Sequence, residues 1–97
     1  MNTAFKALSD PTRRRVLELL KQGPLSAGEL ADQFDVSKST MSAHFAILRE
    51  ADLVMSEKQG KSVVYQLKMS VLEDALLGFA RTFGWELKPT QTNEEEI

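Results

Sequence analysis

Apolar residues recur at helical spacing through the first half of the chain. Successive apolar positions lie three or four residues apart, which is the pattern of amphipathic helices that bury one face. The pattern stops at residues with capping or turn chemistry, such as Asp10-Pro11 and Gly23-Pro24. These breaks predict four helices, over residues 3–8, 12–22, 25–34 and 37–51.

Only Asp35 and Val36 separate the third predicted helix from the fourth. Ser26 and Glu29 form an S-x-x-E capping box for the third helix, and Ser37 can cap the fourth. Two helices joined by so short a turn have the layout of a helix-turn-helix, in which the second helix contacts bases with its first residues.

The helix at 37–51 has an apolar stripe and a small, polar, cationic leading end. Met41, Phe45 and Leu48 follow helical spacing and are expected to face inward. A leading end of this kind can enter a DNA major groove. Within it, Ser37 is the residue most expected to have a structural role, because it is the cap. The candidate DNA-contacting residues at this end are Ser37, Lys38, Ser39, Thr40 and Ser42.

Three arginines crowd the start of the second predicted helix, where the helix dipole disfavours cations. Arg13 leans towards the apolar face, so we expect it to pair inside the protein. Arg14 and Arg15 are expected to be solvated or close to the DNA backbone.

After residue 51 the apolar pattern changes to that of β-strands. Two β-branched or aromatic runs, LVMSEK and SVVYQL, are separated by QGK, in which Gly60 can take a positive φ. A two-stranded hairpin directly after a recognition helix is the wing of a winged helix-turn-helix. The residues at its tip that could contact phosphate or the minor groove are Lys58, Gln59 and Lys61.

A final helix is predicted over residues 71–87, with Ser70 as its cap. It carries more apolar residues than one small domain can cover. Two copies of the chain, packed through this helix and the helix at 3–8, would bury the excess. An effector pocket lined by Phe79, Phe83 and Trp85 is the alternative use of the aromatic residues. The expected dimer-interface residues are Phe5, Leu8, Leu72, Leu76, Phe79, Ala80 and Phe83.

These elements make one domain, mainly α with a small β-hairpin: a winged helix-turn-helix of about five helices and a two-stranded wing. We expect residues 1–87 to form this DNA-binding and dimerisation domain. The polar, acidic segment 88–97 is expected to be a disordered tail.

Charge is segregated along the chain. The net charge of −2 is unusual for a DNA-binding protein, but residues 1–68 carry ten Lys or Arg against eight Asp or Glu, which leaves +2. Residues 69–97 carry two basic and six acidic residues, which leaves −4. Attraction to phosphate depends on the local cationic surface, so the acidic end does not exclude nucleic acid as a partner.

Cysteine is absent and there is one histidine among the 97 residues. This composition excludes disulfides and thiolate metal ligands and lacks the nitrogen donors that transition metals prefer. No cofactor is expected. The chain also has no apolar run long enough to span a membrane and no signal peptide, so we expect a cytoplasmic protein without membrane insertion.

Four segments in order, ALSDPTRRRVLELL, LSAGELADQF, VSKSTMSAHFAILREADLV and KQGKSVVYQL, resemble the ArsR/SmtB family of bacterial winged-helix repressors. The resemblance covers about residues 2–86 and is greatest to a metal-free autorepressor subgroup. It implies repression by blocking RNA polymerase. It also suggests that His44 donates to a DNA phosphate, although a hydrogen-bonded packing histidine is an equal alternative.

The chain departs from the family pattern at two kinds of position. Some metal-sensing members carry cysteines on the helix that here begins LSAGEL, and this chain has none. Others carry His and carboxylate pairs on the last helix, where this chain offers only Glu73, Asp74 and Glu86. Metal sensing is therefore not expected. Ala43 stands where many members have a larger polar residue or a histidine, so it either contacts a thymine methyl group or weakens base readout.

Together these patterns predict a sequence-specific DNA-binding regulator, a repressor or autorepressor that binds an imperfect palindrome as a homodimer. The expected partners are double-stranded operator DNA, a second copy of the chain and an unidentified effector or sequestering protein. The alternative is a winged-helix module that binds protein, but the Lys, Ser and Thr surface of the fourth helix favours DNA. No nucleophile-base pair, phosphate-binding loop or metal cluster indicates an enzyme.

Overall fold

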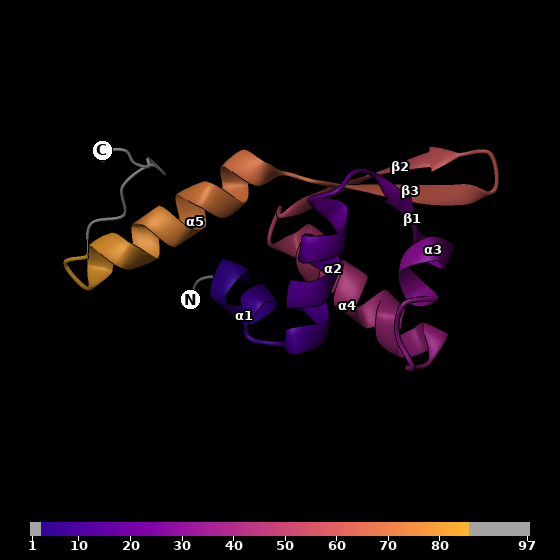
Figure 1. Ribbon diagram of the computed structural model, residues 1–97, viewed down its shortest axis with the longest axis horizontal. Coiled ribbons are helices and arrows are strands. Elements are labelled where there is room, and N and C mark those ends of the chain that lie inside the picture. The colour runs from indigo at the N-terminus through magenta and orange to yellow at the C-terminus, as the bar shows by residue number, and fades with distance from the viewer. Residues whose placement is uncertain (1–2, 86–97) are drawn as a thin grey trace, which may run out of the picture.

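The computed structural model describes residues 3–85, which form a winged helix-turn-helix (Figure 1). The helices are α1 (Thr3–Leu8), α2 (Pro11–Leu20), α3 (Ala27–Ala31), α4 (Lys38–Glu50) and α5 (Met69–Thr82), and the strands are β1 (Leu25–Ser26), β2 (Val54–Gln59) and β3 (Ser62–Leu67). The mainly α winged fold predicted from the sequence is thus confirmed. The tail predicted at 88–97 lies outside the described residues, as do the last two positions of the final predicted helix.

The core forms where α2, α3 and α4 meet the sheet. The apolar stripe predicted for α4 is confirmed, since its three residues are buried, and three residues of α2 at helical spacing form a matching buried stripe. Tyr65 of β3 closes the core by stacking on Phe45 of α4, with ring centroids 4.7 Å apart. The six stripe residues are Val16, Leu17, Leu20, Met41, Phe45 and Leu48.

The sheet has three strands in the order β1-β3-β2, where the sequence predicted a hairpin of two. The extra strand, β1, pairs antiparallel with β3, so that Leu25 faces Tyr65 and Ser26 faces Val64. The predicted hairpin is confirmed as β2 and β3, but β1 was not predicted because a strand of two residues is too short to show an alternating pattern. β1 ties the start of the helix-turn-helix to the wing.

α3 is shorter than predicted, and the turn to α4 is correspondingly longer. Its capping box is confirmed, since Ser26 accepts from the Glu29 N–H and the Glu29 side chain accepts from the Ser26 N–H. Beyond Ala31 the chain forms four-residue turns, in one of which the N–H of Phe34 donates to the Ala31 carbonyl. These turns place Phe34 against the core.

α5 begins and ends at positions other than those predicted. Ser70 is not its cap; the helix follows Lys68, whose N–H donates to the Leu53 carbonyl at 2.8 Å, so backbone pairing fixes its start. It ends early because Gly84 takes φ 72°. The N–H of Trp85 then donates to the Ala80 carbonyl at 2.8 Å, which completes a Schellman motif.

Asp10 caps α2 as predicted, with its carboxylate accepting from the N–H groups of Thr12 and Arg13 at 2.8 and 3.1 Å. Burial acts to raise the pKa of this carboxyl. The two backbone donors, together with the nearby His44 and Arg13 side chains, outweigh burial and hold the pKa below its ordinary value. Folding therefore favours the ionised form.

Replacing this cap should destabilise the protein in a pH-dependent way. Asp10→Ala is expected to lower the free energy of unfolding by about 1 kcal/mol near neutral pH. Because folding lowers the pKa, the stabilisation is present above the unfolded value of about 3.9 and is lost as pH falls through the folded value. Urea unfolding followed by circular dichroism, at about pH 7 and about pH 3, should show the difference between the two proteins shrinking in acid.

Asp10→Asn is the matched control, because Asn keeps a capping oxygen without the charge. It should retain most of the stability near neutral pH. A destabilisation by Asp10→Ala that is equal at both pH values would contradict this account of the cap.

Candidate nucleic-acid interface

The leading end of α4 presents small polar side chains to solvent. Ser37 has extended backbone angles, φ −70° and ψ 159°, and its Oγ accepts from the Thr40 N–H at 3.1 Å, which makes it the N-cap. The opposite face of the helix is anchored in the core by Met41 and Phe45. The candidate residues that stand exposed beside the cap are Lys38, Ser39, Thr40, Ser42 and Ala43.

Three hydroxyl groups at this end are joined by hydrogen bonds. The Ser37 Oγ donates to the Thr40 Oγ1 at 2.9 Å and lies 3.1 Å from the Ser39 Oγ. Because Ser37 has a single hydroxyl proton, Ser39 must supply the proton of the second bond. The Thr40 hydroxyl accepts in this arrangement, and within residues 3–85 its own proton has no acceptor.

The wing is held at a fixed position relative to α4. The Arg49 Nη1 of α4 donates to the Tyr65 hydroxyl of β3 at 2.7 Å, beside the stack of Phe45 on Tyr65. Sequence reasoning missed Arg49, because a pairing across 16 residues leaves no periodic signal. These contacts fix the base of the wing next to α4.

The wing tip is cationic. Gln59 pairs with Ser62, and Gly60 between them has φ 62°, as the predicted turn requires. Lys58, Gln59 and Lys61 are all exposed there, as expected. Within residues 3–85, no carboxylate forms a salt bridge with these two lysines or with Lys38 of α4. Their charges are available to phosphates.

The three arginines of α2 differ in their surroundings. Arg13 is buried and pairs internally, as predicted, and its Nη1 lies 3.0 Å from the Nδ1 of His44. The His44 side chain is only 14% exposed, which favours the packing interpretation over a phosphate contact. Arg14 donates to the Leu8 carbonyl, and Arg15 pairs with Glu18.

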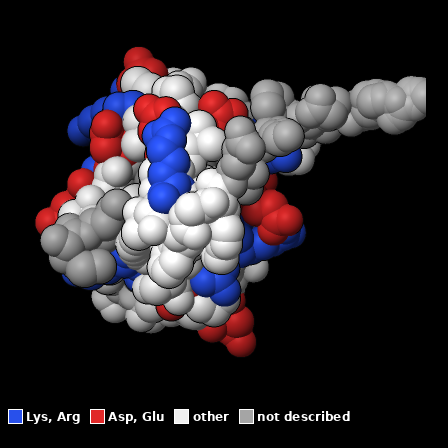
Figure 2. All heavy atoms as spheres, turned by 90° about the vertical axis from the view of Figure 1, so that its left-hand side faces the viewer, with Lys and Arg blue, Asp and Glu red and all other residues white. Residues whose placement is uncertain are grey.

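An apolar surface lies on the side of the molecule formed by α1 and the second half of α5. The rings of Phe5 and Phe79 meet edge to face at 4.6 Å, and Phe83 follows at 5.0 Å from Phe79. Leu76 is 44% and Phe83 57% exposed, and Figure 2 shows a broad uncharged area on this end of the molecule. We call Phe5, Leu8, Leu76, Phe79 and Phe83 the α1–α5 surface.

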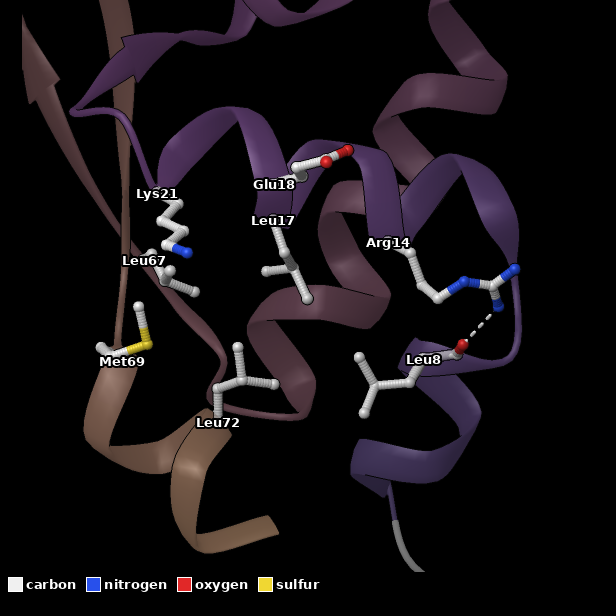
Figure 3. Close-up of a pocket in the computed structure, with 8 residues that line it drawn as sticks. All are labelled: Leu8, Arg14, Leu17, Glu18, Lys21, Leu67, Met69 and Leu72. Atoms are coloured by element: carbon white, nitrogen blue, oxygen red, sulfur yellow. Dashed lines mark hydrogen bonds between the residues drawn. The ribbon is translucent and has the colours of Figure 1, made fainter. Parts of the chain in front are cut away.

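Of the other two residues expected at the dimer interface, one is buried in its own chain and the other is partly buried. Ala80 is buried, and Leu72 packs against the core from the first turn of α5. Figure 3 shows Leu72 pointing towards Leu17 of α2 across a hollow of about 280 Å³, on whose edge Arg14 bonds the Leu8 carbonyl. This hollow lies between the start of α5 and the side of α2.

Within the described part of the chain, no three His, Asp or Glu side chains come together as a metal site. Glu73 and Asp74 of α5 are exposed and stand without a histidine nearby in sequence. No helix among residues 3–85 is long and apolar enough to cross a bilayer.

Known proteins share this arrangement. Residues 8–57 match the model of a helix-turn-helix domain. The transcriptional repressor SdpR of Bacillus subtilis (strain 168) is 43% identical over 76 residues, which cover 78% of this chain and 84% of that repressor. The arsenical resistance operon repressor of Staphylococcus xylosus is 38% identical over 73 residues, covering 75% and 70% of the two chains.

Solved structures agree with these relatives. The crystal structure of an ArsR family transcriptional regulator superposes with a TM-score of 0.78 at 30% identity, over 84% of this chain and 90% of that one. HlyU from Vibrio cholerae superposes with a TM-score of 0.69 at 30% identity, over 84% and 88%. These relatives favour a DNA-binding regulator over a protein-docking module. The chain is a DNA-binding transcriptional regulator and belongs to the ArsR/SmtB family of winged helix-turn-helix repressors.

Proposed function

We propose that this regulator represses transcription as a homodimer that binds an imperfect palindrome. In this arrangement α4 of each subunit enters one of two successive major grooves, and each wing contacts the flanking backbone. The observation that carries the proposal is the leading end of α4, where Lys38, Ser39, Thr40, Ser42 and Ala43 are exposed while the helix is anchored by a buried apolar face.

The two parts of this surface have different tasks in the proposal. The small hydroxyl side chains of Ser39 and Thr40, with Ala43 beside them, suit contacts to base edges and thymine methyl groups. Lys58 and Lys61 end a hairpin whose lysines have no carboxylate partner in residues 3–85, which suits contacts to phosphate. Repression follows when the bound dimer blocks RNA polymerase, and the regulator's own promoter is the first target to examine.

The division of tasks can be tested with DNA selected from a random duplex library by the wild-type protein. Lys58→Ala and Lys61→Ala should weaken binding to the selected duplex and to a scrambled duplex about equally, and each should reduce the salt slope by about 1. Ser39→Ala and Thr40→Ala should instead reduce the preference for the selected duplex. Fluorescence anisotropy over a range of salt concentrations measures both effects.

Lys21→Ala is the matched control, because it removes an exposed lysine at the far end of α2. It should change neither the affinity nor the salt slope. If the wild-type protein bound selected and scrambled DNA equally at moderate salt, sequence-specific binding would be refuted.

The proposed dimer is supported by the α1–α5 surface. Burying a large apolar side chain contributes roughly 1.5–3 kcal/mol. Association of two copies would bury the exposed parts of Leu76 and Phe83 in each, and this gain opposes the costs of association. The groove between Phe5, Leu8 and Phe79, about 400 Å³ in volume, is shaped to receive a side chain of the second copy.

Leu76→Glu should convert the dimer to a monomer, because it places an unpaired charge in an apolar interface. Leu76 is 44% exposed in the single chain, so the monomer should stay folded. Affinity for a palindromic duplex should fall to about that for one half-site. Sedimentation velocity and anisotropy on the same samples measure both.

Gln22→Glu adds the same charge at an exposed site in the turn after α2 and should leave the protein dimeric. A wild-type protein that is monomeric at tens of micromolar, yet binds palindromic DNA tightly, would contradict the proposal.

We further propose that metal ions do not regulate this protein, since the chain has no cysteine and a single histidine. Zinc, copper, nickel or arsenite at micromolar free concentration should leave the affinity for selected DNA unchanged in an anisotropy titration. A reproducible change of tenfold, equivalent to about 1.4 kcal/mol of coupling, would reveal a metal site.

A further inference from the structure

The guanidinium of Arg13 lies where α1, α2 and α4 meet. It extends from the first turn of α2, and the residue is only 7% exposed. Its Nε donates to the Ala7 carbonyl at 2.9 Å, and its Nη2 donates to the Lys6 carbonyl at 2.8 Å. Both carbonyls belong to the last turn of α1. The Arg13 side chain therefore links α2 to the end of α1.

The third arm of the same guanidinium reaches α4. The Arg13 Nη1 lies 3.0 Å from the His44 Nδ1. An arginine can only donate, so this His44 nitrogen must accept, and the imidazole proton must lie on Nε2. The Nε2 atom points to the Asp10 carboxylate, 3.9 Å away. One ring nitrogen of His44 is thus hydrogen-bonded to α2, and the other faces the Asp10 cap at a distance too long for a hydrogen bond.

α1 is also part of the α1–α5 surface. Its Phe5 ring contacts Phe79 of α5, and Phe5 directly precedes Lys6 and Ala7, whose carbonyls accept from Arg13. A continuous series of contacts therefore runs from that surface, through the end of α1 and Arg13, to His44 in the middle of α4. No other side-chain hydrogen bond found in residues 3–85 joins α1 or α2 to α4.

We infer that Arg13 and His44 are positioning residues, which fix the angle of the reading helix α4 relative to the surface through which two subunits associate. This inference rests on the proposed dimeric reading of a palindrome. In a dimer, the position of α4 relative to the α1–α5 surface sets the distance and rotation between the two reading helices. One base pair of extra spacing moves a half-site by about 3.4 Å along the duplex. If α4 is held at a fixed angle, the dimer binds such a site weakly. If α4 can change its angle, the dimer binds the altered site almost as well as the original.

A direct contact between His44 and DNA would behave differently. A lost phosphate contact weakens binding to one half-site and to the full site alike, and it flattens the salt slope. A lost positioning bond weakens the full site more than the half-site and leaves the salt slope unchanged. These two signatures separate the two roles.

The hydrogen bond itself can be observed without any variant, because His44 is the single histidine of the chain. Two-bond proton–nitrogen NMR spectra of the uniformly labelled full-length protein should show one imidazole, with the proton on Nε2 and Nδ1 unprotonated. A proton on Nδ1 at neutral pH, or an even mixture of tautomers, would overturn the assignment of Arg13 as its partner.

Two substitutions then test the role in DNA binding. His44→Leu removes the acceptor, whereas His44→Asn places an amide oxygen close to the position of Nδ1. The probes are the palindromic duplex selected by the wild-type protein, a duplex with one half-site, and versions of the palindrome with one base pair added or removed at its centre. His44→Leu should weaken binding to the palindrome by roughly two- to thirtyfold, change half-site binding little, and bind the altered spacings almost as well as the original.

His44→Asn should restore both the affinity and the rejection of altered spacings. Equal losses on palindrome and half-site with a flatter salt slope would assign His44 to the DNA contact and overturn the inference. If His44→Leu fails to fold, His44→Asn tests the inference alone. A positioning role requires the His44→Asn protein to keep the wild-type spacing preference. A different result would refute the proposed function: selection by the wild-type protein of DNA that contains no paired half-sites.

Discussion

The burial of one face of α4 is the constraint on which the rest of the structure depends. Met41, Phe45 and Leu48 each lose nearly all contact with solvent, at roughly 1.5–3 kcal/mol apiece. The cap at Ser37 contributes about 1 kcal/mol. Apolar burial therefore decides which way the helix faces, and the cap decides where it starts. Because the buried face is fixed, the polar leading end can only point outward.

The wing follows from the same constraint. Tyr65 is buried because it stacks on Phe45, and its hydroxyl is satisfied by Arg49 of α4. An alternating strand with one residue fixed in the core must place its neighbours on the solvent side. β1 pairs with the other edge of β3, so the short strand before α3 and the wing belong to one sheet. The Arg49–Tyr65 bond and the Phe45–Tyr65 stack therefore hold the base of the wing against α4.

The buried guanidinium of Arg13 contacts α4 through His44. Removing a guanidinium from water is costly unless its donors are satisfied, and Arg13 meets two carbonyls and one imidazole nitrogen. The arrangement suits an arginine alone, because only its planar fork reaches three acceptors in different directions. Apolar packing would hold these helices together equally well, but it would fix their relative rotation less sharply than three directional bonds.

The sequence by itself determined the elements whose signals are local. The stripe of α4, the caps at Asp10, Ser26 and Ser37, and the turn at Gly60 depend on residues within four positions of one another, so periodicity and capping chemistry find them. The exposed candidates on α4 and at the wing tip followed from those elements, as did the inward turn of Arg13.

Only the tertiary structure decided the features that join distant segments. The strand β1 exists because β3 offers it a partner, and α5 starts where Lys68 pairs with Leu53. His44 is turned towards Arg13, 31 residues away, and Ala80 is covered by its own chain. Neither α5 boundary was predicted correctly, because Ser70 has good capping chemistry and the apolar pattern continues past Gly84. Local chemistry gives each segment its preferred conformation, but the pairing of segments is set by contacts between residues far apart in the sequence, and such contacts leave no period to read.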